Sequence, residues 1–212
     1  MFVLAYWMPG SETVFDCVNL ERLLVYKYPY EDITPLSRLT KLDSLSFLNT
    51  YRLKSVRGVA ALQNMEYLGF FLCPKLTDIT EVAELKQMKE LAFDTCKNAR
   101  PFDIVGSLKR LRSLDFSNCG AIGSIAALRD TPDLEEFLFS ESTNVLDGDL
   151  SPMASLPKLR CHAFRDRKHY SHTSDYFDEH AGAGHGRGGP RKRFGTFGDP
   201  NYEPLTVRPA SS

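Results

Sequence analysis

The sequence predicts an α/β fold, a right-handed solenoid with a parallel β-sheet on its concave side and short 3₁₀ or helical segments on its convex side. Three observations predict it. A phrase of the form apolar-x-x-apolar-x-apolar returns at a nearly constant period along most of the chain. The remainder of each copy carries further apolar residues at a spacing of three. Three cysteines share the same period, at Cys73, Cys96 and Cys119.

Each copy of the phrase fits a β-strand followed by a turn. Its fourth and sixth positions alternate as a strand requires, so both side chains face the core. The copies begin at Leu20, Leu42, Met65, Met88, Leu111, Leu134 and Leu159. Their sixth positions are Val25, Phe47, Phe70, Phe93, Phe116, Phe139 and Phe164. A fixed period of about 20 to 29 residues with this spacing is the signature of a leucine-rich repeat, in which stacking buries the apolar residues of each copy.

Between the strands, the apolar spacing of three favours 3₁₀ or short helical segments on the convex side. The fourth positions of the phrase are 22 residues apart at the first step and 23 at each of the next four, and the last step, from Phe137 to His162, is 25. The extra length coincides with the turn residues Asp147-Gly148-Asp149, so we expect it to bulge from the convex side. The polar His162 at a core position indicates that the solenoid ends there.

The phase of the cysteines predicts a structural role. Cys73, Cys96 and Cys119 each occupy the ninth position of a copy, and Thr50 and Ser142 hold that position in the flanking copies. In leucine-rich repeats this position forms an internal ladder, where a small side chain bonds to the backbone of the turn. We therefore expect buried, reduced thiols and a cytoplasmic protein. The chain has no close pair such as C-x-x-C, so no zinc site is predicted.

The two ends of the chain differ from the repeats. We expect an N-terminal cap or truncated first repeat over residues 1–19, a leucine-rich-repeat solenoid over residues 20–164, and a C-terminal cap over residues 165–181. Residues 182–212 are rich in Gly and Pro, which predicts a disordered tail. The apolar N-terminus is a poor signal peptide, and no run approaches the roughly 18 apolar residues of a membrane span, so no membrane association is predicted.

Other motifs give weaker signals for chemistry. His169 and His172, with the carboxylates that follow them, could form a metal cluster, but metal sites usually draw their ligands from a rigid scaffold. The triplet Arg191-Lys192-Arg193 is short, and a net charge of −1 gives no basic footprint for nucleic acid. The chain has no G-x-S-x-G, H-E-x-x-H or P-loop. We therefore predict no metal, no cofactor, no nucleic-acid partner and no enzymatic activity.

The variable positions of the phrase predict a binding surface on the concave face. The N-terminal half of this surface is apolar and aromatic, and the C-terminal half is acidic. Exposed apolar residues gathered in a patch usually indicate a partner, and an acidic zone beside them favours a basic segment. The predicted partner-binding residues are Leu24, Tyr26, Leu48, Tyr67, Phe71, Glu90, Asp94, Asp115 and Glu136.

Two alternatives to a separate partner remain open for these residues. The apolar side chains Leu48, Phe71 and Leu72 could pack under the N-terminal cap or on one another. The surface could also pack against the tail, whose Arg187 and Arg191–Arg193 would suit the acidic half and inhibit the protein itself.

The segment Asp32-Ile-Thr-Pro-Leu-Ser-Arg-Leu-Thr-Lys-Leu-Asp-Ser-Leu-Ser-Phe47 resembles the short bacterial repeats of internalins, as does Leu76-Thr-Asp-Ile-Thr80. The repeats of the regulatory subunit of a eukaryotic protein phosphatase are similar. The resemblance covers about residues 20–164. Internalins bind host proteins through their concave face, so it implies protein binding here. The ladder of this chain carries Cys and Thr where internalins carry Asn.

The function predicted from the sequence is non-catalytic protein–protein recognition through the concave face. One alternative is a regulatory inhibitor or immunity-type protein that blocks a single toxic or catalytic partner. Another is a structural module cut from a larger protein.

Overall fold

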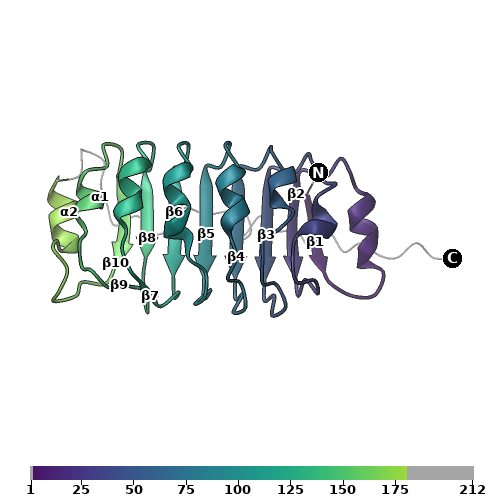
Figure 1. Cartoon of the computed structure of the whole chain (residues 1–212), viewed down its shortest axis with the longest axis horizontal. Helices are drawn as coiled ribbons and strands as arrows, with labels where there is room; N and C mark the ends of the chain where they lie inside the picture. Colours follow the sequence, from purple (N-terminus) through teal and green to yellow (C-terminus); the bar gives the residue numbers. More distant parts are fainter. Residues whose placement is uncertain (1, 181–212) are drawn as a thin grey trace.

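An eight-stranded parallel sheet runs along the whole length of the computed structural model, which describes residues 2–180 (Figure 1). Adjacent strands are joined in the order β1-β2-β3-β4-β5-β6-β8-β10, so the chain adds one strand at a time. The strands are β1 (Phe2–Tyr6), β2 (Arg22–Tyr26), β3 (Ser44–Leu48), β4 (Tyr67–Phe71), β5 (Glu90–Asp94), β6 (Ser113–Ser117), β8 (Glu136–Phe139) and β10 (Cys161–Phe164). The predicted parallel sheet is confirmed. We call one strand with the segment that follows it a rung.

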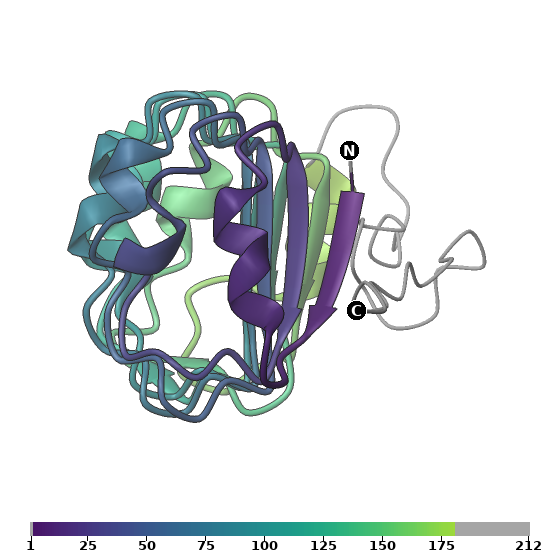
Figure 2. The same ribbon diagram turned by 90° about the vertical axis from the view of Figure 1, so that its right-hand side faces the viewer.

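Most segments that return to the next strand lie on the side of the core opposite the sheet (Figure 2). They are η2 (Thr34–Leu36), η3 (Val59–Ala61), η4 (Thr80–Glu84), η5 (Pro101–Asp103), η6 (Val105–Ser107), η7 (Ala126–Asp130) and the helix α1 (Ser151–Ala154). The first return segment, η1 (Ser11–Asp16), instead lies beside the strands at the N-terminal end of the stack (Figure 2). Most of the return segments are 3₁₀ turns because every third residue faces the core: Ile79, Val82 and Leu85 are all buried around η4. The predicted convex 3₁₀ and helical segments are confirmed.

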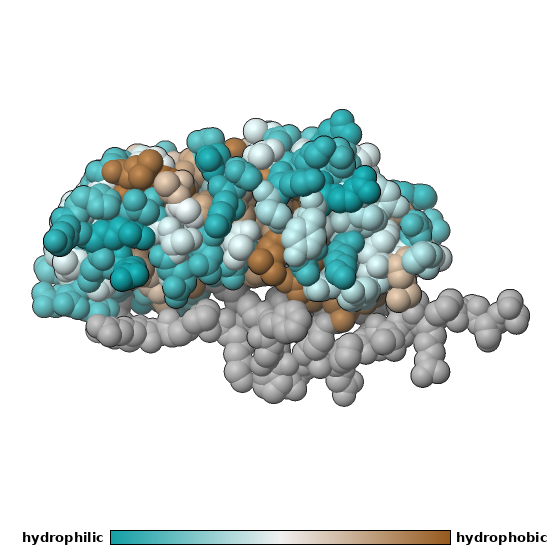
Figure 3. Space-filling model, turned by 90° about the horizontal axis from the view of Figure 1, so that it is seen from below, coloured by the Kyte–Doolittle hydropathy of each residue, from teal (hydrophilic) through white to brown (hydrophobic). Residues whose placement is uncertain are grey.

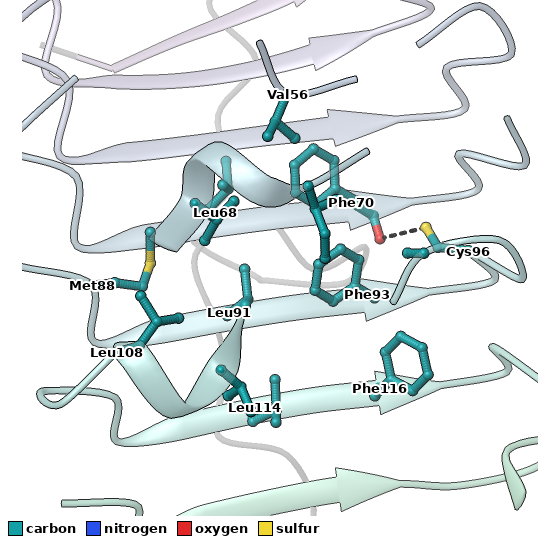
Figure 4. Packing of buried hydrophobic residues seen from close by; sticks show 14 of the residues in the cluster. Val56, Leu68, Phe70, Met88, Leu91, Phe93, Cys96, Leu108, Leu114 and Phe116 are labelled. Atoms are coloured by element: carbon teal, nitrogen blue, oxygen red, sulfur yellow. Dashed lines mark hydrogen bonds between the residues drawn. The ribbon is translucent and has the colours of Figure 1, made fainter. Parts of the chain in front are cut away.

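The core is built from identical positions stacked rung on rung. The rings of Phe47, Phe70, Phe93 and Phe116 form one file, with centroid separations of 5.6, 5.3 and 5.7 Å (Figure 4). All four rings are fully buried. The register explains the file, because each sixth position pairs with the sixth position of the next strand.

The eighth residue of every repeat from the first to the sixth adopts the left-handed backbone conformation. These residues are Lys27, Asn49, Leu72, Thr95, Asn118 and Glu141, with φ between 55° and 59°. The conformation turns the chain at the end of each strand, while the backbone hydrogen bonds between neighbouring repeats continue. For example, the amide of Leu72 still donates to the carbonyl of Asp94 at 2.9 Å. None of the six is glycine, and for the four that are not Asn the conformation costs roughly 1–2 kcal/mol of local strain each. The sequence pattern did not predict this feature.

The cysteine ladder is confirmed, with one correction. The thiol of Cys96 donates to the carbonyl oxygen of Phe70 at 3.4 Å (Figure 4), and that of Cys119 donates to Phe93 at 3.7 Å. Thr50 joins the ladder at 3.3 Å from the sulfur of Cys73. All three thiols are buried, and burial raises the pKa of Cys119 to about 12.

The prediction that Ser142 holds the next rung of the ladder is wrong. Ser142 is exposed, and Thr143 is buried in its place. The hydroxyl of Thr143 donates to the carbonyl oxygen of Phe116 at 2.7 Å and accepts from the amide of Cys119 at 3.1 Å. One extra residue in the turn after β8 shifts the ladder position, which a fixed period could not anticipate.

The extra length of the last repeat lies where the turn residues predicted it, between the short strand β9 (Asn144–Val145) and α1. β9 pairs with β7 (Ala121–Ile122) in a separate two-stranded sheet. Gly148 has φ +68° there, and its carbonyl accepts from the amide of Ser171 at 2.8 Å. The loop is therefore held by the segment that follows β10.

Different elements cover the core at the two ends of the stack. At the N-terminal end, Trp7 packs against the rings of Phe15, Tyr28 and Tyr30. At the C-terminal end, helix α2 (Ser174–His180) places Phe177 5.5 Å from the ring of His162, which also lies 3.5 Å from Asp178.

The predicted domain boundaries stay predictions, and the tail prediction for residues 182–212 lies outside the described residues. Within residues 2–180, no helix is both long enough and apolar enough to cross a membrane.

Candidate functional site

The third, fifth and seventh positions of each phrase face away from the core and form one surface, which we call the concave face. The alternation of the strand separates them from the core residues at positions four and six. Leu24, Tyr67, Ala92 and Leu138 lie on this face, and none of them belongs to the cluster of core residues. The strand register aligns these positions in three rows across the sheet.

Three aromatic residues and one leucine form a row across the first four strands, which we call the aromatic row. It consists of Tyr26, Leu48 and Phe71 at the seventh positions of β2, β3 and β4, and of Tyr6, the register partner of Tyr26 on β1. Tyr6 and Tyr26 are stacked with their ring centroids 4.8 Å apart. The ammonium group of Lys27 lies 5.4 Å from the centroid of the Tyr6 ring, a cation–π distance, and a hydrogen bond to Tyr6 raises the pKa of this lysine. The side-chain amide of Asn49 donates to the Tyr26 hydroxyl at 2.8 Å. These contacts fix the rings as a preorganised apolar ridge.

Gly69 determines how two predicted site residues are arranged. A Cβ atom at this position would lie 2.6 Å from the Tyr67 hydroxyl oxygen and 2.8 Å from Cε2 of Phe71. The two rings therefore lean over Gly69 from either side, which only a residue without a side chain allows. As a result Tyr67 exposes only 9% of its surface.

The acidic zone begins on the strand next to the aromatic row. Asp94 on β5 is the register partner of Phe71 on β4, and Glu90 is the partner of Tyr67. The carboxylate of Asp94 accepts from the hydroxyl of Thr95 at 2.8 Å and from the amide of Asn118 at 3.2 Å. Within residues 2–180 neither Glu90 nor Asp94 forms an ion pair.

Further along the sheet the acidic zone is partly neutralised. The carboxylate of Asp115 accepts from Ser117 at 2.7 Å. Glu136 on β8 exposes 6% of its surface, accepts from Ser113 at 3.3 Å and lies 3.4 Å from the guanidinium of Arg160. β5 therefore presents two carboxylates that no cation of the described chain neutralises.

The structure places all nine predicted site residues on one face of the sheet, but it does not expose them equally. Leu24, Tyr67 and Glu136 are buried, with exposed fractions of 5, 9 and 6%. The other six are half-buried: Tyr26, Leu48, Phe71, Glu90, Asp94 and Asp115. Their role in partner binding stays a prediction.

Sequence reasoning missed Tyr6, Lys27 and Gly69. Tyr6 precedes Tyr26 by less than one full period, so it falls outside the phrase, although the apolar residues Val3, Ala5 and Trp7 alternate around it as in a strand. Its ring is 52% exposed, more than that of any predicted site residue. The side of the molecule toward which the strands point is mostly hydrophilic, with separate apolar patches (Figure 3).

No group of three or more His, Cys, Asp or Glu side chains is placed to hold a metal ion anywhere between residues 2 and 180. His169 and His172 are used elsewhere: His169 bonds to the carbonyl of Val145 at 3.0 Å, and His172 bonds to Ser171 at 2.8 Å.

Comparison with known proteins agrees with this architecture. The family described as BspA type leucine rich repeat region matches residues 18–146 in six copies. A solved internalin (inlF) from Listeria monocytogenes is similar, with a TM-score of 0.64 and 24% identity over 76% of this chain, which spans 45% of that protein. Internalin C2 from the same species has a TM-score of 0.59 and 24% identity over 74% of this chain and 68% of its own. Sequence comparison with curated proteins gave no match.

Proposed function

The chain belongs to the BspA-type leucine-rich-repeat family, and on that premise we propose that it is a non-catalytic recognition protein that binds a protein partner through its concave face. The observation that carries the proposal is the aromatic row, in which large apolar side chains follow one another without a polar residue from β1 to β4: Tyr6, Tyr26, Leu48 and Phe71. Tyr and Phe are enriched among residues that dominate binding energy at protein interfaces.

The chemistry of the face supports a partner with two features. Its aromatic half would receive an apolar anchor, and the acidic residues beside it would attract a basic segment. Glu90 and Asp94 lie one strand away from Tyr67 and Phe71, about 5 Å at the usual strand spacing. A partner segment could therefore engage both zones within a few residues.

A reducing compartment suits this protein, and the cytoplasm is the location we propose. All five cysteines are free, and Cys73, Cys96 and Cys119 act as reduced hydrogen-bonding groups in the core. Disulfides are rare in cytosolic proteins.

The test compares capture of partners from source lysate by three forms of the protein. These are the wild type, Phe71→Glu, and a control, Leu146→Glu, which places the same charge on another apolar residue, one that is exposed. A partner retained by the wild type and the control but lost by Phe71→Glu supports the proposal. Equal recovery by all three contradicts it. A captured enzyme or toxin whose activity falls on binding would identify the inhibitor alternative.

A further inference from the structure

The concave face and the C-terminal segment of the chain carry complementary features in matching order. The strands follow one another from β10 to β1 (Figure 1), and in this direction the face presents acidic residues first and the aromatic row second. Going from His180 toward the C-terminus, the sequence presents Arg187 and Arg191-Lys192-Arg193 first, then Phe194 and Phe197. A segment that crossed the sheet away from β10 would set cations against the acidic zone and aromatic rings against the aromatic row.

We propose that residues 181–212 of this chain bind its own concave face, with the basic residues at Glu90 and Asp94 and the phenylalanines at the aromatic row. These residues lie outside the described part of the chain, and their charge, the order of their side chains and their length favour the contact. The contact itself does not depend on a separate partner. Its consequence, that the segment competes with a partner for the face, rests on the proposed function.

Charge favours the contact. Residues 181–212 contain five Lys and Arg residues against two Asp and Glu residues, although the whole chain has a net charge of −1. Glu90 and Asp94 are half-buried and form no ion pair within residues 2–180. The neutral groups of Thr95 and Asn118 orient the Asp94 carboxylate without neutralising it. A cationic segment is the partner that these carboxylates fit.

The segment that follows His180 is long enough to reach both the acidic zone and the aromatic row. Helix α2 ends at His180 and packs on β10, with the rings of Phe177 and Phe164 5.8 Å apart. In the strand order, β5 is three spacings from β10, which is about 14 Å. Arg187 comes seven residues after His180, a span of up to about 24 Å, and Phe194 comes fourteen residues after it, up to about 48 Å. Both zones are within reach without full extension of the segment.

Covalent attachment makes the contact effective even if it is weak. A segment attached through a short tether reaches a local concentration on the order of millimolar at its site. A contact with a dissociation constant of about 100 µM would then be occupied roughly 90% of the time. Any external ligand for the face would have to displace it.

The test uses a fluorescein-labelled synthetic peptide of residues 185–202 and three full-length proteins. The first protein is the wild type. The second, the tail variant, carries Arg187→Glu, Arg191→Glu, Lys192→Glu and Arg193→Glu, which frees the face. The third adds the isosteric changes Glu90→Gln and Asp94→Asn to the tail variant. Circular dichroism and thermal midpoints check that all three are folded alike.

We expect the peptide to bind the tail variant at least about tenfold more tightly than the wild type, because the tethered segment no longer competes. Glu90→Gln/Asp94→Asn should weaken this binding at least about fivefold, and raising the salt from about 50 to 300 mM should weaken it further. A control peptide of the same composition, with the two phenylalanines placed before the basic triplet, should bind less well, because its cations and rings would then follow the opposite order to the zones of the face.

Three results would overturn the proposal: equal affinity for the wild type and the tail variant, no binding to either, or equal affinity for the ordered and reordered peptides. A peptide with Phe194→Ser and Phe197→Ser gives an independent check of the aromatic end and should also bind less tightly. The results also distinguish failure of the proposed function from failure of the tail contact. A partner lost by Phe71→Glu with no peptide binding leaves that function standing, and peptide binding without any partner leaves only the tail contact.

Discussion

The thiol of Cys96 donates a hydrogen bond to the backbone carbonyl oxygen of Phe70, with sulfur and oxygen 3.4 Å apart, across the boundary between two neighbouring rungs. The backbone amide of Cys96 in turn donates to the sulfur of Cys119 on the next rung, also at 3.4 Å. A single residue thus links three successive turns. The stack is joined by such bonds as well as by its sheet and its file of phenylalanines.

Replacing Cys96 should show what this link contributes. Cys96→Ala leaves the buried carbonyl of Phe70 without its thiol donor, so we expect the free energy of unfolding to fall by about 1–3 kcal/mol. Cys96→Ser keeps a donor of similar size and should recover part of the loss. Urea denaturation measures both. Equal stability of the wild type and Cys96→Ala would show that the bond contributes nothing.

The pH dependence of stability follows from Cys119. Burial raises its pKa from the ordinary thiol value of 9.0 to about 12. A raised pKa in the folded state means that the stabilisation is complete below pH 9 and is lost as the pH rises toward 12. Between these values the wild type should lose at most about 1.4 kcal/mol per pH unit relative to Cys119→Thr, which does not titrate. Denaturant titrations of both proteins at several pH values give the difference, and parallel curves would contradict the assignment.

Phe93 stands in the middle of the phenylalanine file, with Phe70 and Phe116 on either side. Phe93→Ala should destabilise the protein by about 3–5 kcal/mol, because the neighbouring rings cannot collapse into the space that it leaves. Phe93→Leu retains most of the volume and serves as the milder comparison. A near-neutral result for Phe93→Ala in urea denaturation would be incompatible with the observed packing.

Substitution of a residue in the left-handed conformation should instead stabilise the protein. Leu72 has φ 56° and exposes 43% of its surface, so it has strain and little packing to lose. Leu72→Asn should raise the free energy of unfolding by about 0.5–1 kcal/mol, because Asn tolerates this conformation better. The matched control is Leu146→Asn, at an exposed leucine outside the left-handed region, which should have almost no effect. If thermal midpoints of the two variants move together, relief of strain is not the cause.

The sequence pattern predicted the parts of this fold that depend on the repeat. Phe93 and Leu91 face the core because a strand alternates, and the thiols of Cys96 and Cys119 align because a period repeats. It also placed all nine site residues on one face. What it missed arises from local backbone geometry and long-range contact. The spacing of the repeats does not predict that Leu72 adopts a left-handed conformation, or that Thr143 replaces Ser142 in the cysteine ladder.

The same reasoning explains why the sequence did not predict how deeply some residues of the candidate site are buried. The phrase shows that Tyr67 and Glu136 occupy variable positions, but not how far neighbouring side chains cover them. Tyr67 is covered because Gly69 lets its ring lean inward, and Glu136 because Arg160, from the following repeat, reaches back to it. The pattern does not predict Tyr6 because the first strand lies outside the period.

The one-at-a-time addition of strands has a mechanical consequence. Each interior strand is bonded only to the strand before it and the strand after it, so no strand of the main sheet ties distant parts of the stack together. Tension applied between the two ends would detach the terminal rung and leave the rest intact. Each detachment would release about 23 residues, roughly 80 Å of contour length. The molecule should therefore lengthen under load in a series of nearly equal steps, one rung at a time, and should not unfold in a single step.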